Sequence, residues 1–173
     1  NPLGSPIAFF LIIRVALWRP FSGWLPDYLG GTALAVVFAG LLLLISLVDL
    51  RTRRIPYALW LPLLGLALAQ ALWLGRPAPA NALLGLAVGG ALLYLLSFPR
   101  RGVLGPGDIR LAAALGAMLG LPATFLALGA GILMAGAGAL WLLVTRRAGL
   151  RDRMAYAPYL ALGAWLVWTH SFG

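Results

Sequence analysis

Long apolar segments, each close to the length that crosses a lipid bilayer, dominate this chain. They occupy residues 29–49, 57–74, 80–98, 108–121, 124–145 and 154–169, with a shorter segment at 7–18. Hydrophobic residues make up 62% of the 173 residues, and the mean hydropathy is +0.97. A membrane-spanning helix needs about 20 predominantly apolar residues and satisfies its own backbone hydrogen bonds. The pattern therefore predicts an all-α, polytopic transmembrane helical bundle with six core spans.

The first residues differ from the rest of the chain. Residues 1–6 read NPLGSP and do not begin with Met, so we interpret them as a trimmed or added terminus. Segment 7–18 contains Arg14 and is short, so we expect either a short span or a helix that lies in the membrane interface. Residues 7–173 are expected to form a single transmembrane domain.

The positive charges indicate how the chain is oriented in the membrane. All 13 strongly basic residues are arginines, and the formal net charge is +9. Most of them lie in three connections, at 50–56, 99–107 and 146–153, which are every second connection along the chain. These connections must share one membrane face, and the positive-inside rule makes that face cytoplasmic. The arginines are expected to set topology and contact anionic lipids, which argues against nucleic-acid binding.

Acidic residues are scarce, and two of them lie where an acid is costly. The chain has four Asp and no Glu, and Asp49 and Asp108 each lie at the end of an apolar segment, beside an arginine-rich connection. The predicted topology places both at the cytoplasmic ends of their helices, at similar depth. Two carboxyl groups in a partly dry site cannot both ionise easily. One of them could activate a water against a peptide carbonyl while the other protonates the leaving amine.

Each acid also has a purely structural interpretation. Asp108 is explained equally by an N-cap at the start of a helix, and Asp49 by a helix-end acid neutralised by nearby arginines. A small transporter, in which two acids relay protons or cations, is a further alternative, although relay acids are expected nearer the bilayer midplane. The sequence alone leaves these alternatives open.

The chain has few residues that could support another catalytic chemistry. The chain has no Cys, which excludes disulfides, thiolate metal sites and a cysteine nucleophile. The single histidine, His170, is interpreted as a polar residue in an interfacial aromatic belt. Neither a metal nor a cofactor is therefore expected.

Three motifs occur in a fixed order along the chain. They are Asp49 followed by a basic turn and Ile55-Pro56, then Gly105-Pro106-Gly107-Asp108 followed by Ile109-Arg110-Leu111, and finally Ala157-Pro158-Tyr159-Leu160-Ala161-Leu162-Gly163. On these motifs the sequence resembles the type IV prepilin peptidases, of the GxGD intramembrane aspartyl protease group, over about residues 29–168. It departs from the family at Tyr57, where Asn or Asp is usual, and it resembles a minimal form without the cysteine-rich cytoplasmic domain.

The resemblance implies a hydrolase of the bacterial cytoplasmic (inner) membrane, of the kind that serves type IV pili and type II secretion. Such an enzyme cleaves the basic leader of a prepilin or pseudopilin precursor at the cytoplasmic face. The resemblance implies that Asp49 and Asp108 are the catalytic pair. Gly105, Gly107, Pro56 and Arg110 are expected to form the surrounding motif and substrate loop. An inactive relative that acts only in pilus or secretion assembly is the alternative.

Two further patterns concern packing. Small residues near Gly85 and from Gly129 onward have spacings that allow helices to approach closely in a bilayer. Five tryptophans are expected to anchor the helix ends at the membrane interfaces, namely Trp60, Trp73, Trp141, Trp165 and Trp168.

Overall fold

The computed structural model describes residues 27–97, 105–145 and 155–172. The chain divides into two compact units, residues 1–37 and 38–173. The described part of the first unit is the beginning of helix α2 (Asp27–Thr52), and the remainder of α2 belongs to the second unit. All regular elements of the described residues are helical, which confirms the all-α prediction. Segment 7–18 lies outside the described residues.

The second unit is a bundle of helices whose lengths fit an integral membrane protein. After α2 come α3 (Tyr57–Ala69), the π-helical turn η2 (Gln70–Leu74), α4 (Pro79–Ser97), α5 (Pro106–Leu119), α6 (Leu121–Val144) and α7 (Ala157–Phe172). Four helices are long and apolar enough to cross a membrane: α2 from Gly31, α3 continued by η2, α4, and α6. Helices α5 and α7 have 14 and 16 residues, fewer than the roughly 20 that a span needs.

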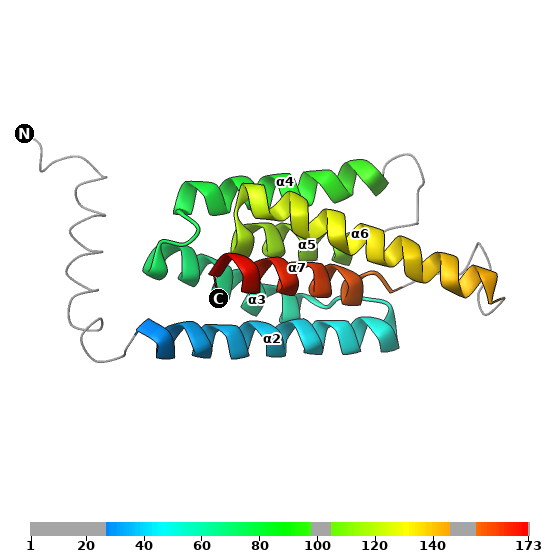
Figure 1. Cartoon of the computed structure of the whole chain (residues 1–173), viewed down its shortest axis with the longest axis horizontal. Coiled ribbons are helices and arrows are strands. Elements are labelled where there is room, and N and C mark those ends of the chain that lie inside the picture. Colours follow the sequence, from blue (N-terminus) through cyan, green and yellow to red (C-terminus); the bar gives the residue numbers. More distant parts are fainter. Residues whose placement is uncertain (1–26, 98–104, 146–154, 173) are drawn as a thin grey trace, which may run out of the picture. The chain divides into compact units, whose positions relative to one another are not determined.

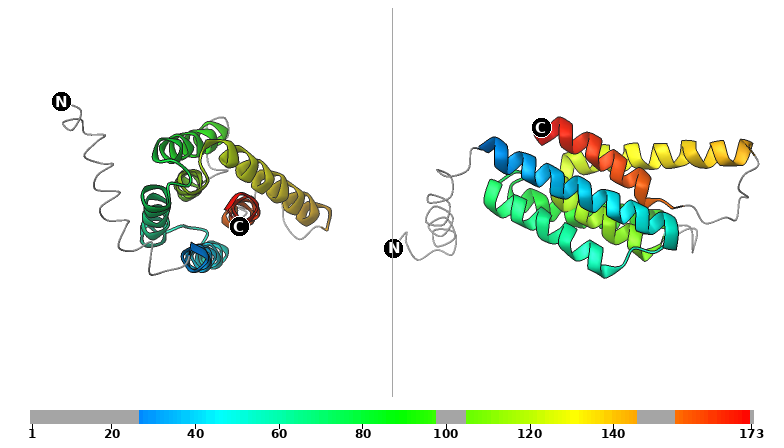
Figure 2. Two further views of the ribbon diagram at one scale, coloured as in Figure 1. Left: turned by 60° about the vertical axis from the view of Figure 1, so that its left-hand side comes forward. Right: turned by 90° about the horizontal axis from the view of Figure 1, so that it is seen from below.

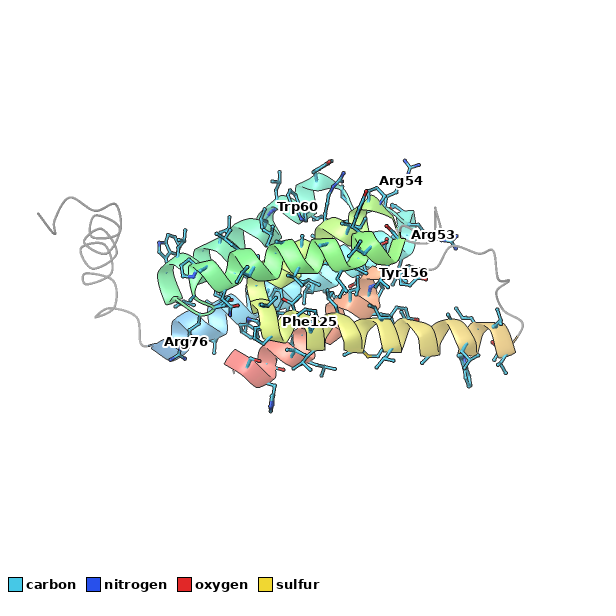
Figure 3. The ribbon with its side chains drawn as sticks, turned by 90° about the horizontal axis from the view of Figure 1, so that it is seen from above. Arg53, Arg54, Trp60, Arg76, Phe125 and Tyr156 are labelled. Atoms are coloured by element: carbon cyan, nitrogen blue, oxygen red, sulfur yellow. The ribbon has the colours of Figure 1, made fainter. Side chains whose placement is uncertain are left out.

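The helix ends of the second unit are arranged as the alternation of arginine-rich connections predicts. The C-terminal ends of α2, α4 and α6 and the N-terminal ends of α5 and α7 lie at one end of this unit (Figure 1). Figure 3 shows Arg53 and Arg54 at that end and Arg76 at the opposite end. Helix α7 runs beside both α6 and α2 (Figure 2). The motif residues that the sequence places in separate segments therefore converge.

Glycines let the helices of the core touch backbone to backbone. A Cβ added to Gly85 of α4 would overlap the carbonyl oxygen of Gly116 in α5, and one added to Gly89 would overlap that of Ala112. The same holds between α7 and α6, where a Cβ on Gly163 would overlap the carbonyl oxygen of Ala127. The small residues near Gly85 therefore serve close helix packing, as the sequence pattern predicts.

A single glycine, rather than a proline, makes the break between α5 and α6. The sequence predicts that an apolar segment ends near Pro122, whereas the structure ends α5 at Leu119 and starts α6 at Leu121. Gly120 between them has φ +77, a left-handed conformation that favours glycine. Pro122 lies in the first turn of α6, where its missing N–H has no intrahelical acceptor to lose.

The tryptophans divide into exposed and buried ones. Trp73 and Trp141 are 70% and 67% exposed, as interface anchors must be. The expectation is wrong for Trp168, which is buried and stacks on Trp165 at 5.7 Å between ring centroids. Its indole N–H donates to Oε1 of the buried Gln70, because a buried indole needs an acceptor. Trp168 is therefore a core residue that joins α7 to the start of η2.

We predict that alanine substitutions at two helical glycines have opposite effects on stability. Gly65→Ala in α3 adds a Cβ with nothing within 4 Å, so helix propensity should stabilise the protein by up to about 1 kcal/mol. Gly85→Ala has the same gain in helix propensity, but its Cβ would push α4 away from α5. This displacement should lower the free energy of unfolding by about 1–3 kcal/mol. Thermal unfolding of both variants in detergent measures the difference. Equal midpoints would contradict the close approach of α4 and α5.

Candidate active site

Asp49 lies in the last turn of α2 and is 4% exposed. Its Oδ2 accepts the backbone N–H of Ala157, the first residue of α7, at 3.2 Å. The first N–H groups of a helix have no intrahelical acceptor and carry partial positive charge. They can therefore satisfy an acid at the C-terminus of α2, where the dipole of α2 itself disfavours a negative charge. The first and third motifs are thus joined directly.

The arginines beside Asp49 do not neutralise it. Arg51, Arg53 and Arg54 are exposed, and among the described residues none of them forms an ion pair with Asp49. Arg53 instead ends the helix, with φ +50 and its N–H donating to the carbonyl oxygen of Asp49 at 2.7 Å. The structure therefore does not support the interpretation of Asp49 as a helix-end acid paired with arginine.

Asp108 is the third residue of α5 and is 8% exposed. Its Oδ2 accepts the N–H of Gly105 at 2.9 Å, and Gly105 is the residue that caps the helix. The N-cap interpretation of Asp108 is therefore wrong in position, because the acid lies three residues later and reaches back to the cap. One carboxyl oxygen is used in this way, which leaves the other without a role in capping.

The contact between Ile55 and Gly107 brings the first and second motifs together. Ile55 is 8% exposed, and a Cβ added to Gly107 would lie 3.0 Å from the Cβ of Ile55. A larger residue at position 107 would push the two motifs apart. Gly105 is exposed and has an ordinary backbone conformation, and Pro56 is exposed and caps α3. Among the expected motif and loop residues, Gly107 is therefore the one that must be small for this contact to form.

The two acids have similar surroundings. The end of α2 and the start of α5, which carry them, lie at one end of the second unit (Figure 1). Both acids are almost fully buried, so a charge on either carboxyl group is poorly solvated. Ile55, which follows Asp49 in the first motif, contacts Gly107, the neighbour of Asp108. No group of three or more potential metal ligands occurs in the described ranges.

Arg110 contacts α3 instead of either acid. Its guanidinium lies 4.0 Å from the centroid of the Tyr57 ring, and its backbone carbonyl accepts the indole N–H of Trp60 at 2.8 Å. Sequence reasoning missed the local roles of Ala157, Ile55 and Trp60. The Ile-Pro and Ala-Pro motifs contain a signal for the first two, whereas Trp60 resembled any other interfacial tryptophan.

Comparisons with known proteins point to one family. A sequence model of the type IV leader peptidase family matches residues 36–143. The chain is 34% identical over 167 residues to the prepilin leader peptidase/N-methyltransferase of Xanthomonas campestris pv. campestris. The aligned region covers 91% of this chain and 54% of that protein. It is 29% identical over 177 residues to the protein of the same name from Aeromonas hydrophila, covering 98% and 59%. The chain thus spans little more than half the length of these curated relatives. No solved structure matches it.

We predict that cysteines introduced at positions 55 and 107 form a disulfide. The chain contains no other cysteine, and the 3.0 Å separation needs to lengthen only slightly to reach the usual Cβ–Cβ distance of about 3.5–4.5 Å. The Ile55→Cys/Gly107→Cys variant should therefore lose both free thiols on mild oxidation, as measured by thiol labelling and mass spectrometry.

The matched control is Ile55→Cys/Gly105→Cys. Among the described residues beyond its chain neighbours, only Asp108 and Gly107 lie within 4 Å of a Cβ on Gly105, so this pair should keep its thiols. Equal oxidation of both pairs, or none of the first, would contradict the contact between the two motifs.

Proposed function

The chain belongs to the type IV leader peptidase family, and from this premise we propose that it is a membrane-embedded aspartyl endopeptidase. Its substrate is a prepilin or pseudopilin precursor, from which it removes the basic leader. One observation carries the proposal: Asp49 and Asp108, from separate motifs, are both buried, on helix ends that lie at the same end of the second unit and are joined there by the contact between Ile55 and Gly107. The names of the two relatives, prepilin leader peptidase/N-methyltransferase, agree with this activity.

The proposed reaction needs only these two carboxyl groups and water. One carboxylate removes a proton from water, and the water oxygen attacks the carbonyl carbon of the scissile peptide bond. The other carboxyl, which is protonated, gives its proton to the leaving nitrogen as the C–N bond breaks. Burial favours a pair that holds one proton, since two charges in a poorly solvated site repel one another. The products are the leader with a new carboxyl end and a mature protein with a free amine.

The proposal places the enzyme in the bacterial cytoplasmic (inner) membrane, with its site at the cytoplasmic face. The exposed arginines at the end of α2 support this orientation through the positive-inside rule, and they would contact anionic lipid headgroups. Helices α5 and α7 complete the proposed six-span bundle, although each is shorter than a typical span. The protein around them would shield their backbone from lipid.

The proposed substrate has an apolar helix next to a polar leader. Such a helix would approach laterally through the bilayer, and the peptide at the cut must be extended for water to attack. Extended backbone in this environment needs hydrogen-bond partners. Gly105 and Pro56 are exposed beside the buried acids, and the proposal makes these residues, with Gly107 and Arg110, the loop that receives the peptide.

We predict that Asp49→Asn and Asp108→Asn each abolish leader cleavage and leave a folded protein. Asn is nearly isosteric and still accepts the hydrogen bonds from Ala157 and Gly105, so the loss would report on proton transfer. Loss of either proton-transfer group should lower the rate by at least about 100-fold. The assay follows release of the leader from a purified precursor in liposomes, and size-exclusion chromatography checks folding.

The matched control is Asp27→Asn, which changes the acid at the other end of α2 and should keep wild-type turnover. A wild-type protein that releases no leader would favour the alternatives of an inactive relative or a transporter. Full activity of Asp49→Asn or Asp108→Asn would refute the assignment of the pair.

A further inference from the structure

Two aromatic residues at the start of α3, Tyr57 and Trp60, contact the helix that carries Asp108. Together they form what we call the aromatic bracket, with ring centroids 6.2 Å apart and rings nearly perpendicular. We infer that the aromatic bracket positions the first turns of α5, and with them Asp108, for the reaction. This inference rests on the proposed function and goes beyond it, because neither Tyr57 nor Trp60 is among the expected site residues.

The hydrogen bond from Trp60 is the more directional of the two contacts. The indole N–H donates to the carbonyl oxygen of Arg110 at 2.8 Å and is partly buried. An indole has one donor and no acceptor, so its bond fixes where this carbonyl can lie. Arg110 is two residues after Asp108 in the same helix, so the bond restrains the turn that carries the acid.

Tyr57 restrains the side chain of the same residue. The guanidinium of Arg110 lies 4.0 Å from the centre of the Tyr57 ring, a distance at which a cation and an aromatic face attract one another. Tyr57 is 55% exposed, so its attraction to Arg110 comes from the face of the ring and does not depend on burial of the side chain. The bracket thus contacts Arg110 at both its backbone and its side chain.

The bracket also links Asp108 to the segment that follows Asp49. Tyr57 comes directly after Ile55-Pro56, and Ile55 contacts Gly107, the neighbour of Asp108. The beginning of α5 is therefore restrained at Gly107 by Ile55 and at Arg110 by the bracket, one on each side of the acid. A displacement of about 1 Å in a reacting group can lower a rate on the order of 100-fold, so this restraint matters for turnover. Tyr57 and Trp60 act through Arg110, which makes them positioning residues.

The variant that tests the bracket is Trp60→Phe, which keeps an aromatic ring and removes the N–H. It should lower kcat about tenfold and leave KM within about twofold, because binding is kept while the acid is displaced. Tyr57→Leu should lower kcat similarly, and Tyr57→Phe, which keeps the ring face, should restore it. All rates are compared on protein that is monodisperse and fully folded at the assay temperature.

The matched control is Trp73→Phe, the same substitution at an exposed tryptophan in η2. A second readout does not depend on cleavage: amide hydrogen exchange in the first two turns of α5 should accelerate in Trp60→Phe and stay unchanged in Trp73→Phe. If the wild-type chain cleaves the precursor and Trp60→Phe matches it in kcat, the bracket is overturned while the proposed function stands. Unchanged exchange in Trp60→Phe overturns the bracket whether or not the wild-type chain cleaves.

Discussion

A carboxyl group removed from water must find hydrogen-bond donors, and this requirement organises the described part of the second unit. Asp49 and Asp108 are both almost fully buried, and the donor to each is a backbone N–H at the start of a helix, from Ala157 for α7 and from Gly105 for α5. An unpaired polar group in an apolar environment would cost several kcal/mol. The bond to Asp49 therefore places the start of α7 at the end of α2. The bond to Asp108 is local to the start of α5, which meets the first motif through the contact between Gly107 and Ile55.

Close backbone contacts make this convergence possible. Gly85 and Gly89 of α4 lie against the backbone of α5, and Gly163 of α7 lies against that of α6. In a bilayer the lipid tails are as apolar as the side chains, so burying large apolar side chains between helices provides little driving force for their association. Close contact between small residues therefore contributes more to helix association. At the far end from the acids, Gln70 bonds to Trp168 of α7 and to the carbonyl of Met118 in α5. Helices α5 and α7 are thus held at both ends.

The sequence predicts those features that depend on one segment at a time. Apolar length was enough to predict α2, α3, α4 and α6, and the alternation of arginines was enough to predict which helix ends gather together. It does not predict the partner of Asp49, because the Ala-Pro motif indicates that a helix starts at Ala157 but not which side chain, 108 positions away, accepts its backbone N–H. The expectation for Trp168 fails for a similar reason, because contacts such as those with Gln70 and Trp165, and not the residue type, distinguish a buried indole from an interfacial one. The sequence predicts a helix end at Pro122 because a proline fits the position after one helix as well as the first turn of the next.

The central claim is that Asp49 and Asp108 form one site, and a carboxyl titration tests it most directly. All four acidic residues of the chain are Asp, so selective carbon-13 labelling of the Asp carboxyl groups yields few signals, and the loss of one in Asp108→Asn assigns it. The Asp108 carboxyl should titrate at a lower pH in Asp49→Asn than in the wild-type protein, because the neighbouring carboxylate that disfavours its ionisation is gone. An Asp108 pKa that is unchanged by Asp49→Asn would contradict a shared site.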